Sequence, residues 1–135
     1  MIYTVTLNPS IDYIVHLPAI ELGEVNRIQQ DFKLPGGKGI NVSRILNELE
    51  VENTALGFLG GFTGKYIEDW LEAENSKTRF THVDEATRIN VKIKAGQETE
   101  LNGAGPDIPE SAMQELEKKL DSLNEDDILI LAGSI

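Results

Sequence analysis

The sequence predicts an α/β protein with a central, mostly parallel sheet flanked by helices and a separate small β-layer. Short apolar runs alternate with segments whose apolar residues recur at helical spacing, a pattern typical of βαβ units. Two stretches, residues 12–34 and 88–102, instead hold short alternating strands that do not suit a buried sheet. The length of 135 residues fits one domain.

The elements of the central layer follow one another along the chain. Residues 2–7 and 54–59 are apolar runs typical of buried strands, and Ile128–Leu131 forms a third within residues 127–132. Apolar residues at helical spacing predict helices over residues 38–49, 63–74 and 109–123, and Pro109 suits the first turn of the last one. Residues 78–83 are expected to form one further strand.

The second layer is expected from shorter strands. Residues 14–17 and 27–34 are two candidates. Residues 89–94 alternate apolar and polar side chains, which predicts a strand with one wet face. Gly96 then turns the chain so that residues 98–102 pair back as a hairpin. We therefore expect a small antiparallel sheet beside the parallel one.

Composition excludes several classes of function. The chain carries 23 acidic and 12 basic residues and a formal net charge of −11, which argues against nucleic acid and anionic membranes as partners. It contains no cysteine, so disulfides, thiolate metal sites and cysteine nucleophiles are excluded. No apolar run is long enough for a membrane span, and the first residues do not resemble a signal peptide. The expected location is the cytoplasm.

A glycine-rich segment, Pro35–Asn41, precedes the first predicted helix. Gly36 and Gly37 would let the backbone approach a ligand closely, and free amides at a helix start attract anions. Lys38 adds a cation, and Asn41 follows one turn later. The pattern suits a phosphorylated or hydroxyl-rich ligand. A tight strand-to-helix turn explains the same glycines equally well.

Three further side chains are candidate ligand contacts. Asp12 follows a predicted strand end, where it could cap the turn or accept hydrogen bonds from sugar hydroxyls. Arg88 and Asn90 are two residues apart and would share one face of a strand. Arginine suits bidentate phosphate binding, although a lone arginine on a strand is usually a solvated surface residue.

Taken together, these segments resemble the amino-terminal half of the ribokinase-like (PfkB) sugar kinases. The resemblance extends over the whole chain and rests on the order and spacing of Thr6–Asp12, Pro35–Arg44, Gly57–Gly61, Glu100–Pro106 and Leu131–Ser134. Residues 87–92 and 98–103 are most similar to family members that phosphorylate fructose 1-phosphate. Kinases of tagatose 6-phosphate, the family's 6-phosphofructokinases and a non-catalytic sugar-phosphate-binding module are the alternatives.

The resemblance implies a role for each candidate residue. Asp12 would bind sugar hydroxyls, and a site for the sugar phosphate would be lined by Gly36, Gly37, Lys38 and Asn41. Arg88 and Asn90 would reach that phosphate from the small sheet, which acts as a lid; Arg27 is a weaker candidate. Ser134 would lie at the edge of the pocket. The lid would also form a homodimer contact.

The implied reaction transfers the γ-phosphoryl group of ATP to a free sugar hydroxyl, with Mg²⁺ neutralising charge. The family's catalytic base belongs to a Gly-Ala-Gly-Asp motif, which this chain does not contain, so we expect the base to lie beyond Ile135. Residues 103–107 are a near-match that Pro106 interrupts. We therefore expect this chain to hold the sugar-phosphate site alone, without catalytic, nucleotide-binding or metal-binding residues. By that reasoning it is the amino-terminal portion of the kinase, lacks the nucleotide-binding half and is inactive by itself.

Overall fold

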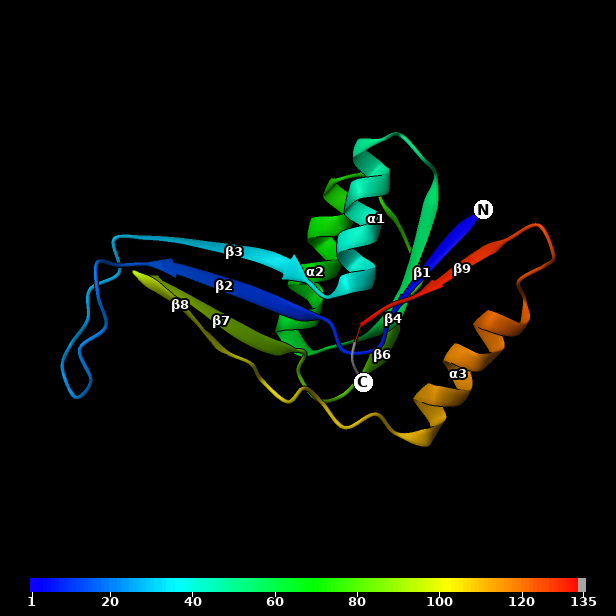
Figure 1. The fold of residues 1–135 in the computed structure, drawn as a ribbon. Helices are drawn as coiled ribbons and strands as arrows, with labels where there is room; N and C mark the ends of the chain where they lie inside the picture. Colours follow the sequence, from blue (N-terminus) through cyan, green and yellow to red (C-terminus); the bar gives the residue numbers. More distant parts are fainter. Residues whose placement is uncertain (134–135) are drawn as a thin grey trace.

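The computed structural model describes residues 1–133 and shows two sheets that extend from a common centre (Figure 1). The strands and helices alternate as the apolar periodicity predicts. In chain order they are β1 (Ile2–Thr6), β2 (Ser10–His16), β3 (Gln30–Gly36), α1 (Lys38–Glu48), β4 (Asn53–Gly60), α2 (Gly61–Ala73), β5 (Lys77–Thr78), β6 (Thr81–Val83), β7 (Arg88–Ala95), β8 (Gln97–Leu101), α3 (Glu110–Asp121) and β9 (Ile128–Leu131).

The central sheet has five strands, and all its pairings are parallel. Its order is β5-β4-β1-β9, and β6 also pairs with β4. Helices α1 and α2 pack on one face, and α3 packs on the other (Figure 1). The predicted parallel sheet with flanking helices is confirmed. The carboxyl ends of β1 and β9 therefore lie side by side, at the edge where α/β proteins bind ligands.

Alternating side chains of the central strands build two hydrophobic clusters. Beneath α1 and α2, Ala55 and Leu59 of β4 pack with Ile40, Ile67 and Leu71 of the helices. On the opposite face, the intervening residues of β4 and Val5 of β1 pack against α3. That second cluster comprises Val5, Leu56, Phe58, Val83, Ala112 and Leu116. Burial on both faces explains the continuous apolar run of β4.

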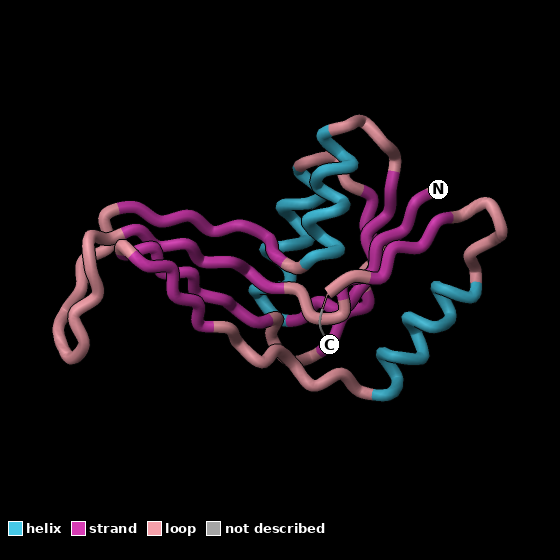
Figure 2. Tube along the Cα trace, in the orientation of Figure 1, coloured by secondary structure: helices cyan, strands magenta, loops and turns pink. Residues whose placement is uncertain are grey.

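The second sheet, which we call the lid, has the strand order β3-β2-β7-β8 (Figure 2). The expectation of an antiparallel sheet was only partly correct. Its two outer pairs, β2–β3 and β7–β8, are antiparallel, but the central pair β2–β7 is parallel. Both central strands leave the same edge of the central sheet, so they run in the same direction. Each then returns through its own antiparallel neighbour.

Several strand boundaries differ from the sequence expectation. Strand β2 begins at Ser10, so Asp12 lies within a strand rather than in a turn. Strand β3 begins only at Gln30, which leaves Arg27 in the preceding loop. The expected strand over residues 78–83 is divided into β5 and β6. Buried Phe80 lies between them and packs into the cluster beneath α1 and α2.

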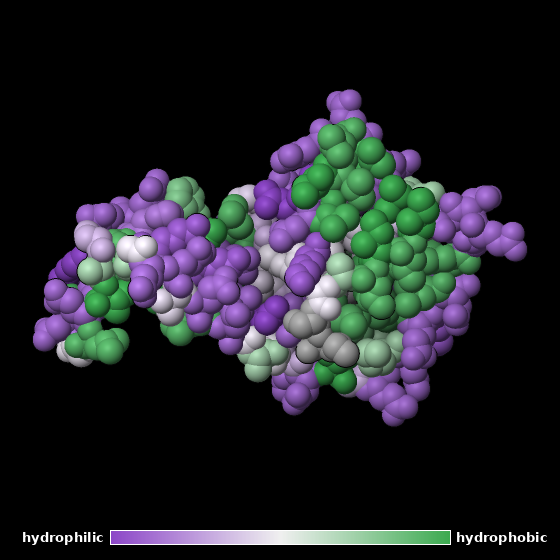
Figure 3. All heavy atoms as spheres, in the orientation of Figure 1, coloured by the Kyte–Doolittle hydropathy of each residue, from purple (hydrophilic) through white to green (hydrophobic). Residues whose placement is uncertain are grey.

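A broad apolar area covers α1 and the β9 side of the central sheet (Figure 3). The exposed large apolar side chains of α1, of the turn after it and of β9 are Ile45, Leu49, Val51, Ile128, Leu129 and Leu131. The visible face of the lid is mainly hydrophilic in the same view. Among residues 1–133, no helix has both the length and the apolar character needed to cross a membrane.

Candidate functional site

A cavity of about 350 Å³ opens where the lid meets the carboxyl ends of β1 and β9. Polar side chains from both sheets and from the start of α1 surround it. The lining residues are Thr6, Asn8, Ser10, Asp12, Gly37, Lys38, Asn41, Arg88, Asn90, Lys92, Glu100, Asn102 and Gly133. The cavity thus collects residues from almost the whole length of the chain, and its size suits a small polar metabolite.

Asp12 is held on the lid wall of this cavity. Its Oδ1 accepts a hydrogen bond of 2.7 Å from the Ser10 hydroxyl, and its Oδ2 lies 3.4 Å from Lys92 Nζ. Gly36 lies directly against the carboxylate, because a Cβ built there would stand 2.5 Å from the Asp12 oxygens. The side chain is only 15% exposed. These contacts leave the carboxylate oriented as an acceptor for hydroxyl groups.

The start of α1 forms the opposite wall. Gly37 precedes the helix with φ 114°, a conformation that side chains other than glycine rarely adopt. No side chain caps this helix start, and its first turn holds no acidic residue. Its free amide groups and the positive end of the helix dipole therefore favour an anion beside Lys38 and Asn41.

Arg88 and Asn90 face the cavity from β7, as their spacing predicted. The Arg88 guanidinium donates to the backbone carbonyl oxygens of Asn8 (3.0 Å) and Gly103 (3.1 Å). Asn90 Oδ1 accepts from the Gly103 backbone N–H at 3.0 Å. Both side chains therefore fasten the lid to the segment that leaves it. Arginine carries five donor hydrogens, so the guanidinium has further donors for a ligand.

The structure brings most of the predicted site residues together, with three differences. Gly36 supports Asp12 rather than lining the cavity. Arg27 lies exposed in the loop between β2 and β3, outside the cavity lining. Ser134 lies outside the described residues, and its neighbour Gly133 lines the cavity.

The catalytic base is a separate expectation, because it was placed beyond Ile135. Ile135 itself lies outside the residues that the structure describes, so the position of the base stays a prediction. The near-match over residues 103–107 begins beside the cavity, where Gly103 forms hydrogen bonds with Arg88 and Asn90. Asp107 is not among the residues that line the cavity, and its backbone N–H donates to Glu85 Oε2 at 2.7 Å.

The sequence reasoning missed several lining residues. Lys92 shares one face of β7 with Arg88 and Asn90, so the strand alternation alone could have identified it. Thr6, Asn8, Ser10, Glu100 and Asn102 lie within segments that carry the family resemblance, but no local pattern gave them a role in the site. The pairing of distant strands places them at the cavity.

The cavity is locally cationic although the chain is strongly acidic. Lys38, Arg88 and Lys92 contribute three positive charges, against two negative charges from Asp12 and Glu100. Across residues 1–133, His, Asp and Glu form no cluster of three or more that could hold a metal ion. The arrangement can bind an anion and several hydroxyl groups together.

The family follows from comparison with known proteins. Residues 5–135 match the model of the pfkB family of carbohydrate kinases, so the chain belongs to this family. It is 56% identical over its whole length to the 1-phosphofructokinase of Bacillus subtilis (strain 168), of which it covers 45%. It is 40% identical to the tagatose-6-phosphate kinase of Staphylococcus epidermidis, of which it covers 44%. The chain thus spans less than half the length of these relatives.

Solved structures agree with this assignment. Phosphofructokinase-2 of Escherichia coli in complex with fructose-6-phosphate has a TM-score of 0.92 at 30% identity. That comparison covers 99% of this chain and 45% of the other. Ribokinase of Cryptococcus neoformans in complex with ADP has a TM-score of 0.64 at 26% identity, covering 80% of this chain and 36% of the ribokinase. The predicted ribokinase-like α/β fold is confirmed.

Proposed function

We propose that the full-length protein transfers the γ-phosphoryl group of ATP to a free hydroxyl of a ketose phosphate, with fructose 1-phosphate as the substrate. One observation supports this most directly. The same cavity holds a fixed carboxylate, Asp12, and two cations: Lys38 at an uncapped helix start and Arg88 on β7. A sugar phosphate needs acceptors for its hydroxyls and donors for its phosphate, and this cavity offers both.

The proposed roles follow the geometry. Asp12 accepts hydrogen bonds from sugar hydroxyls. The phosphate binds between the start of α1, with Gly37 and Lys38, and the Arg88 guanidinium. The amides of Asn41 and Asn90 complete the hydrogen bonding. Phosphoryl transfer depends mainly on positioning and on neutralising charge, so a rigid sugar site contributes directly to the rate.

ATP and Mg²⁺ are part of this proposal. We assign the residues that bind Mg²⁺ and the nucleotide to the part of the protein beyond this chain. A base in a Gly-Ala-Gly-Asp motif beyond Ile135 belongs to the same proposal. Because ATP and sugar phosphates are intracellular metabolites, we place the protein in the cytoplasm.

Tagatose 6-phosphate is the second candidate substrate. The relative from Staphylococcus epidermidis is named for this substrate, and its identity of 40% is substantial. Fructose and tagatose phosphates are both phosphorylated ketohexoses, so the cavity chemistry described above accommodates either. Fructose 6-phosphate is a third ligand to test, because it is bound in the similar Escherichia coli structure.

We propose further that the lid forms a homodimer contact. The loop between β2 and β3 carries Leu22 and Val25, which are 92% and 81% exposed. The same loop also exposes Ile20 and Ile28. A cluster of exposed apolar side chains is typical of a surface that packs against a partner. Arg27 lies in the same loop, and we place its role at this contact. Ser134 is proposed to border the sugar phosphate next to Gly133.

The test is ADP release by the full-length protein with Mg²⁺-ATP and each of three sugars: fructose 1-phosphate, tagatose 6-phosphate and fructose 6-phosphate. We expect the highest kcat/KM with fructose 1-phosphate. Asp12→Asn should lower it, whereas the control Asp69→Asn, on the exposed side of α2, should not. Sugar-phosphate binding without turnover would favour the non-catalytic binding module. Activity of the 135-residue chain alone would show that the base lies within it.

A further inference from the structure

Lys92 lines the cavity, and the proposed roles above do not include it. It lies in β7, where the register sets it beside Ile14 of β2 and opposite Glu100 of β8. Asp12 is two residues from Ile14 on the same face of β2, so it is a diagonal neighbour of Lys92. The lysine side chain reaches across this diagonal, and its Nζ lies 3.4 Å from Asp12 Oδ2.

The two oxygens of Asp12 are thus held differently. Oδ1 accepts from the neutral Ser10 hydroxyl, and Oδ2 faces the ammonium group of Lys92. Among residues 1–133, Lys92 is the one cation within 4 Å of this carboxylate. The pair is largely protected from solvent, with Asp12 15% and Lys92 31% exposed. A charge pair in such a place is screened less by water and salt than one on the surface.

A second carboxylate restrains Lys92 from the outer side. Glu100 Oε1 lies 3.8 Å from the same Nζ, in the cross-strand position of the β7–β8 hairpin. The ammonium group therefore lies between a carboxylate deep in the cavity and one at its rim. This arrangement limits how far the lysine can swing away from Asp12.

We propose that Lys92 is a positioning residue for sugar binding, which acts by fixing the Asp12 carboxylate. This inference rests on the proposed function, because it takes Asp12 as the acceptor for the sugar hydroxyls. Without Lys92, Oδ2 would lose its charged partner, and the carboxylate could rotate or keep a water shell. The carboxylate would then spend less time in the orientation that binds several sugar hydroxyls at once, and sugar binding would weaken.

Lys92 also reduces the repulsion between the Asp12 carboxylate and an incoming phosphate. A phosphate dianion must enter a cavity that already holds the Asp12 carboxylate. Lys92 balances that carboxylate locally, so Lys38 and Arg88 can direct their charge at the phosphate. Without Lys92, the two remaining cations of the cavity would be balanced by its two carboxylates, and the cavity would lose its net positive charge. The loss should therefore fall on sugar-phosphate binding and not on ATP.

The experiment is a double-mutant cycle in the full-length protein, built from Lys92→Met, Asp12→Asn and their combination. The measured quantities are the KM for fructose 1-phosphate and for ATP, with the dissociation constant of the sugar phosphate where turnover is slow. Lys92→Met alone should raise the sugar KM roughly tenfold, the effect of losing one charge-assisted contact, and leave the ATP KM within about twofold. Combined with Asp12→Asn, the same change should add less than about twofold, because its target is gone.

Three variants act as controls. Lys92→Arg keeps the positive charge and should restore the sugar KM to within about threefold of the parent. Lys92→Gln is a second neutral variant and should match Lys92→Met. Lys94→Met removes the next lysine on the same face of β7, which pairs with Glu98 and lies outside the cavity lining, and should change neither KM.

Two results would overturn the inference. If Lys92→Met has the same effect with and without Asp12, the lysine contacts the phosphate directly and does not act through Asp12. If Lys92→Met leaves the sugar KM unchanged, while Asp12→Asn raises it, the lysine has no role in binding. A parent protein that phosphorylates none of the three sugars would overturn the proposed function, and this inference would fall with it.

Discussion

Gly36 and Asp12 are diagonal neighbours across the β2–β3 pair, and the Asp12 carboxylate occupies the space that a side chain at position 36 would need. A Cβ built at Gly36 would lie 2.5 Å from Cγ and from both oxygens of Asp12. This contact explains why a glycine ends β3, where the backbone is otherwise an ordinary extended strand. The glycine shapes the Asp12 side of the cavity although it does not line it.

The first prediction concerns this contact. Gly36→Ala should displace the Asp12 carboxylate and raise the KM for the sugar phosphate by roughly tenfold or more. It should also reduce the free energy of unfolding by about 1–3 kcal/mol, because the added methyl group overpacks the site. In an Asp12→Ala background the clash is relieved, so Gly36→Ala should cost clearly less stability there. Equal losses in both backgrounds would contradict this account, and chemical denaturation of the four proteins measures them.

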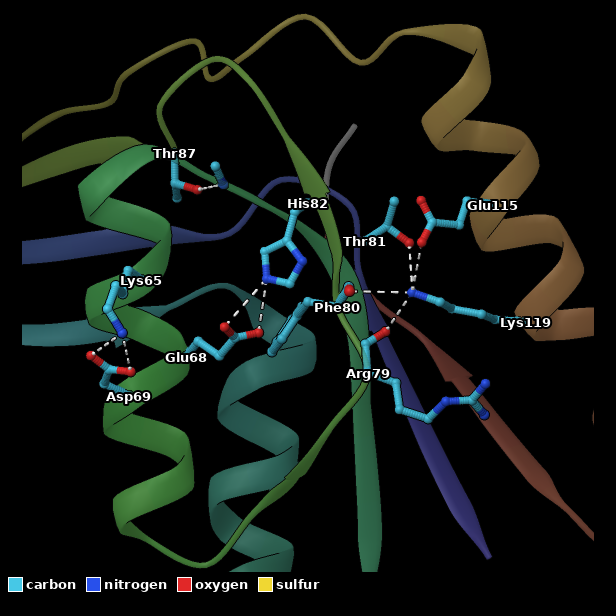
Figure 4. Close-up of polar contacts among 11 residues, drawn as sticks. Lys65, Glu68, Asp69, Arg79, Phe80, Thr81, His82, Thr87, Glu115 and Lys119 are labelled. Carbon is cyan, nitrogen blue, oxygen red and sulfur yellow. Dashed lines mark hydrogen bonds and ion pairs between the residues drawn. The ribbon is translucent and has the colours of Figure 1, made fainter.

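Arg88 holds two backbone carbonyl groups in addition to its proposed contact with the sugar phosphate. Arg88→Lys keeps one positive charge but cannot reproduce the two hydrogen bonds to the Asn8 and Gly103 carbonyls. We expect the KM for the sugar phosphate to rise roughly tenfold to a hundredfold, with little change in the KM for ATP. The matched control is Arg79→Ala, whose side chain points away from the neighbouring contacts (Figure 4). Equal changes in the two KM values would contradict the assignment of Arg88 to the sugar-phosphate site.

Lys119 joins α3 to the segment before β6 (Figure 4). Its ammonium group donates to the carbonyl oxygens of Arg79 (3.1 Å) and Phe80 (3.2 Å) and to the Thr81 hydroxyl (3.0 Å). Lys119→Met should lower the free energy of unfolding by about 1–3 kcal/mol, because three acceptors, two of them in partly buried contacts, lose a charged donor. Lys118→Met, one position earlier on exposed helix surface, should change it by less than about 0.5 kcal/mol. Similar losses for both lysines would show that helix propensity, not this contact, sets the effect.

The lid contains a small group of polar residues whose titration is testable. A hydrogen bond from the Tyr13 hydroxyl and, next, one from Lys33 hold the pKa of Asp31 below its usual range. The ionised form is favoured in the folded state, so this contribution to stability is present above the unfolded pKa. It is lost as the pH falls through the lower, folded pKa. Carboxyl NMR titration should show the Asp31 pKa rising in both Tyr13→Phe and Lys33→Met, and an unchanged pKa in either variant would contradict the assignment.

The proposed dimer contact gives the last prediction. Leu22→Glu and Val25→Glu place a charge on two highly exposed apolar positions of the loop between β2 and β3. If this loop packs against a second copy, the double variant should be monomeric at concentrations where the parent is a dimer. Sedimentation velocity measures the difference. Glu21→Gln and Glu24→Gln, in the same loop, are matched controls that should leave the parent's state unchanged.

The sequence predicted the central layer well because burial on both faces leaves a strong signal. The continuous apolar run of β4 and the spacing of Ile40 in α1 or Ile67 in α2 need no tertiary context to interpret. The candidate residues Asp12, Lys38 and Arg88 were also identified from local patterns and do meet in one cavity.

The lid was harder to predict because its polar residues face a cavity and not bulk water. Ser10 and Asp12 interrupt the apolar alternation, so the sequence pattern predicted a later start for β2 than the structure shows. The parallel pairing of β2 with β7 joins segments far apart in the sequence, and no local periodicity encodes it. The Lys92–Asp12 pair is a consequence of that register, so the sequence near either residue did not predict the contact.

The acceptors that hold Arg88 are main-chain oxygens, and this has a consequence for how such a site can diversify. Any sequence that keeps the backbone path at Asn8 and Gly103 supplies the same two carbonyl groups, whatever side chains it carries there. The arginine therefore stays in place while its neighbours mutate. Single substitutions at Lys38, Asn41 or Asn102 would then change which sugar phosphate the proposed site prefers, while the position of Arg88 stays the same.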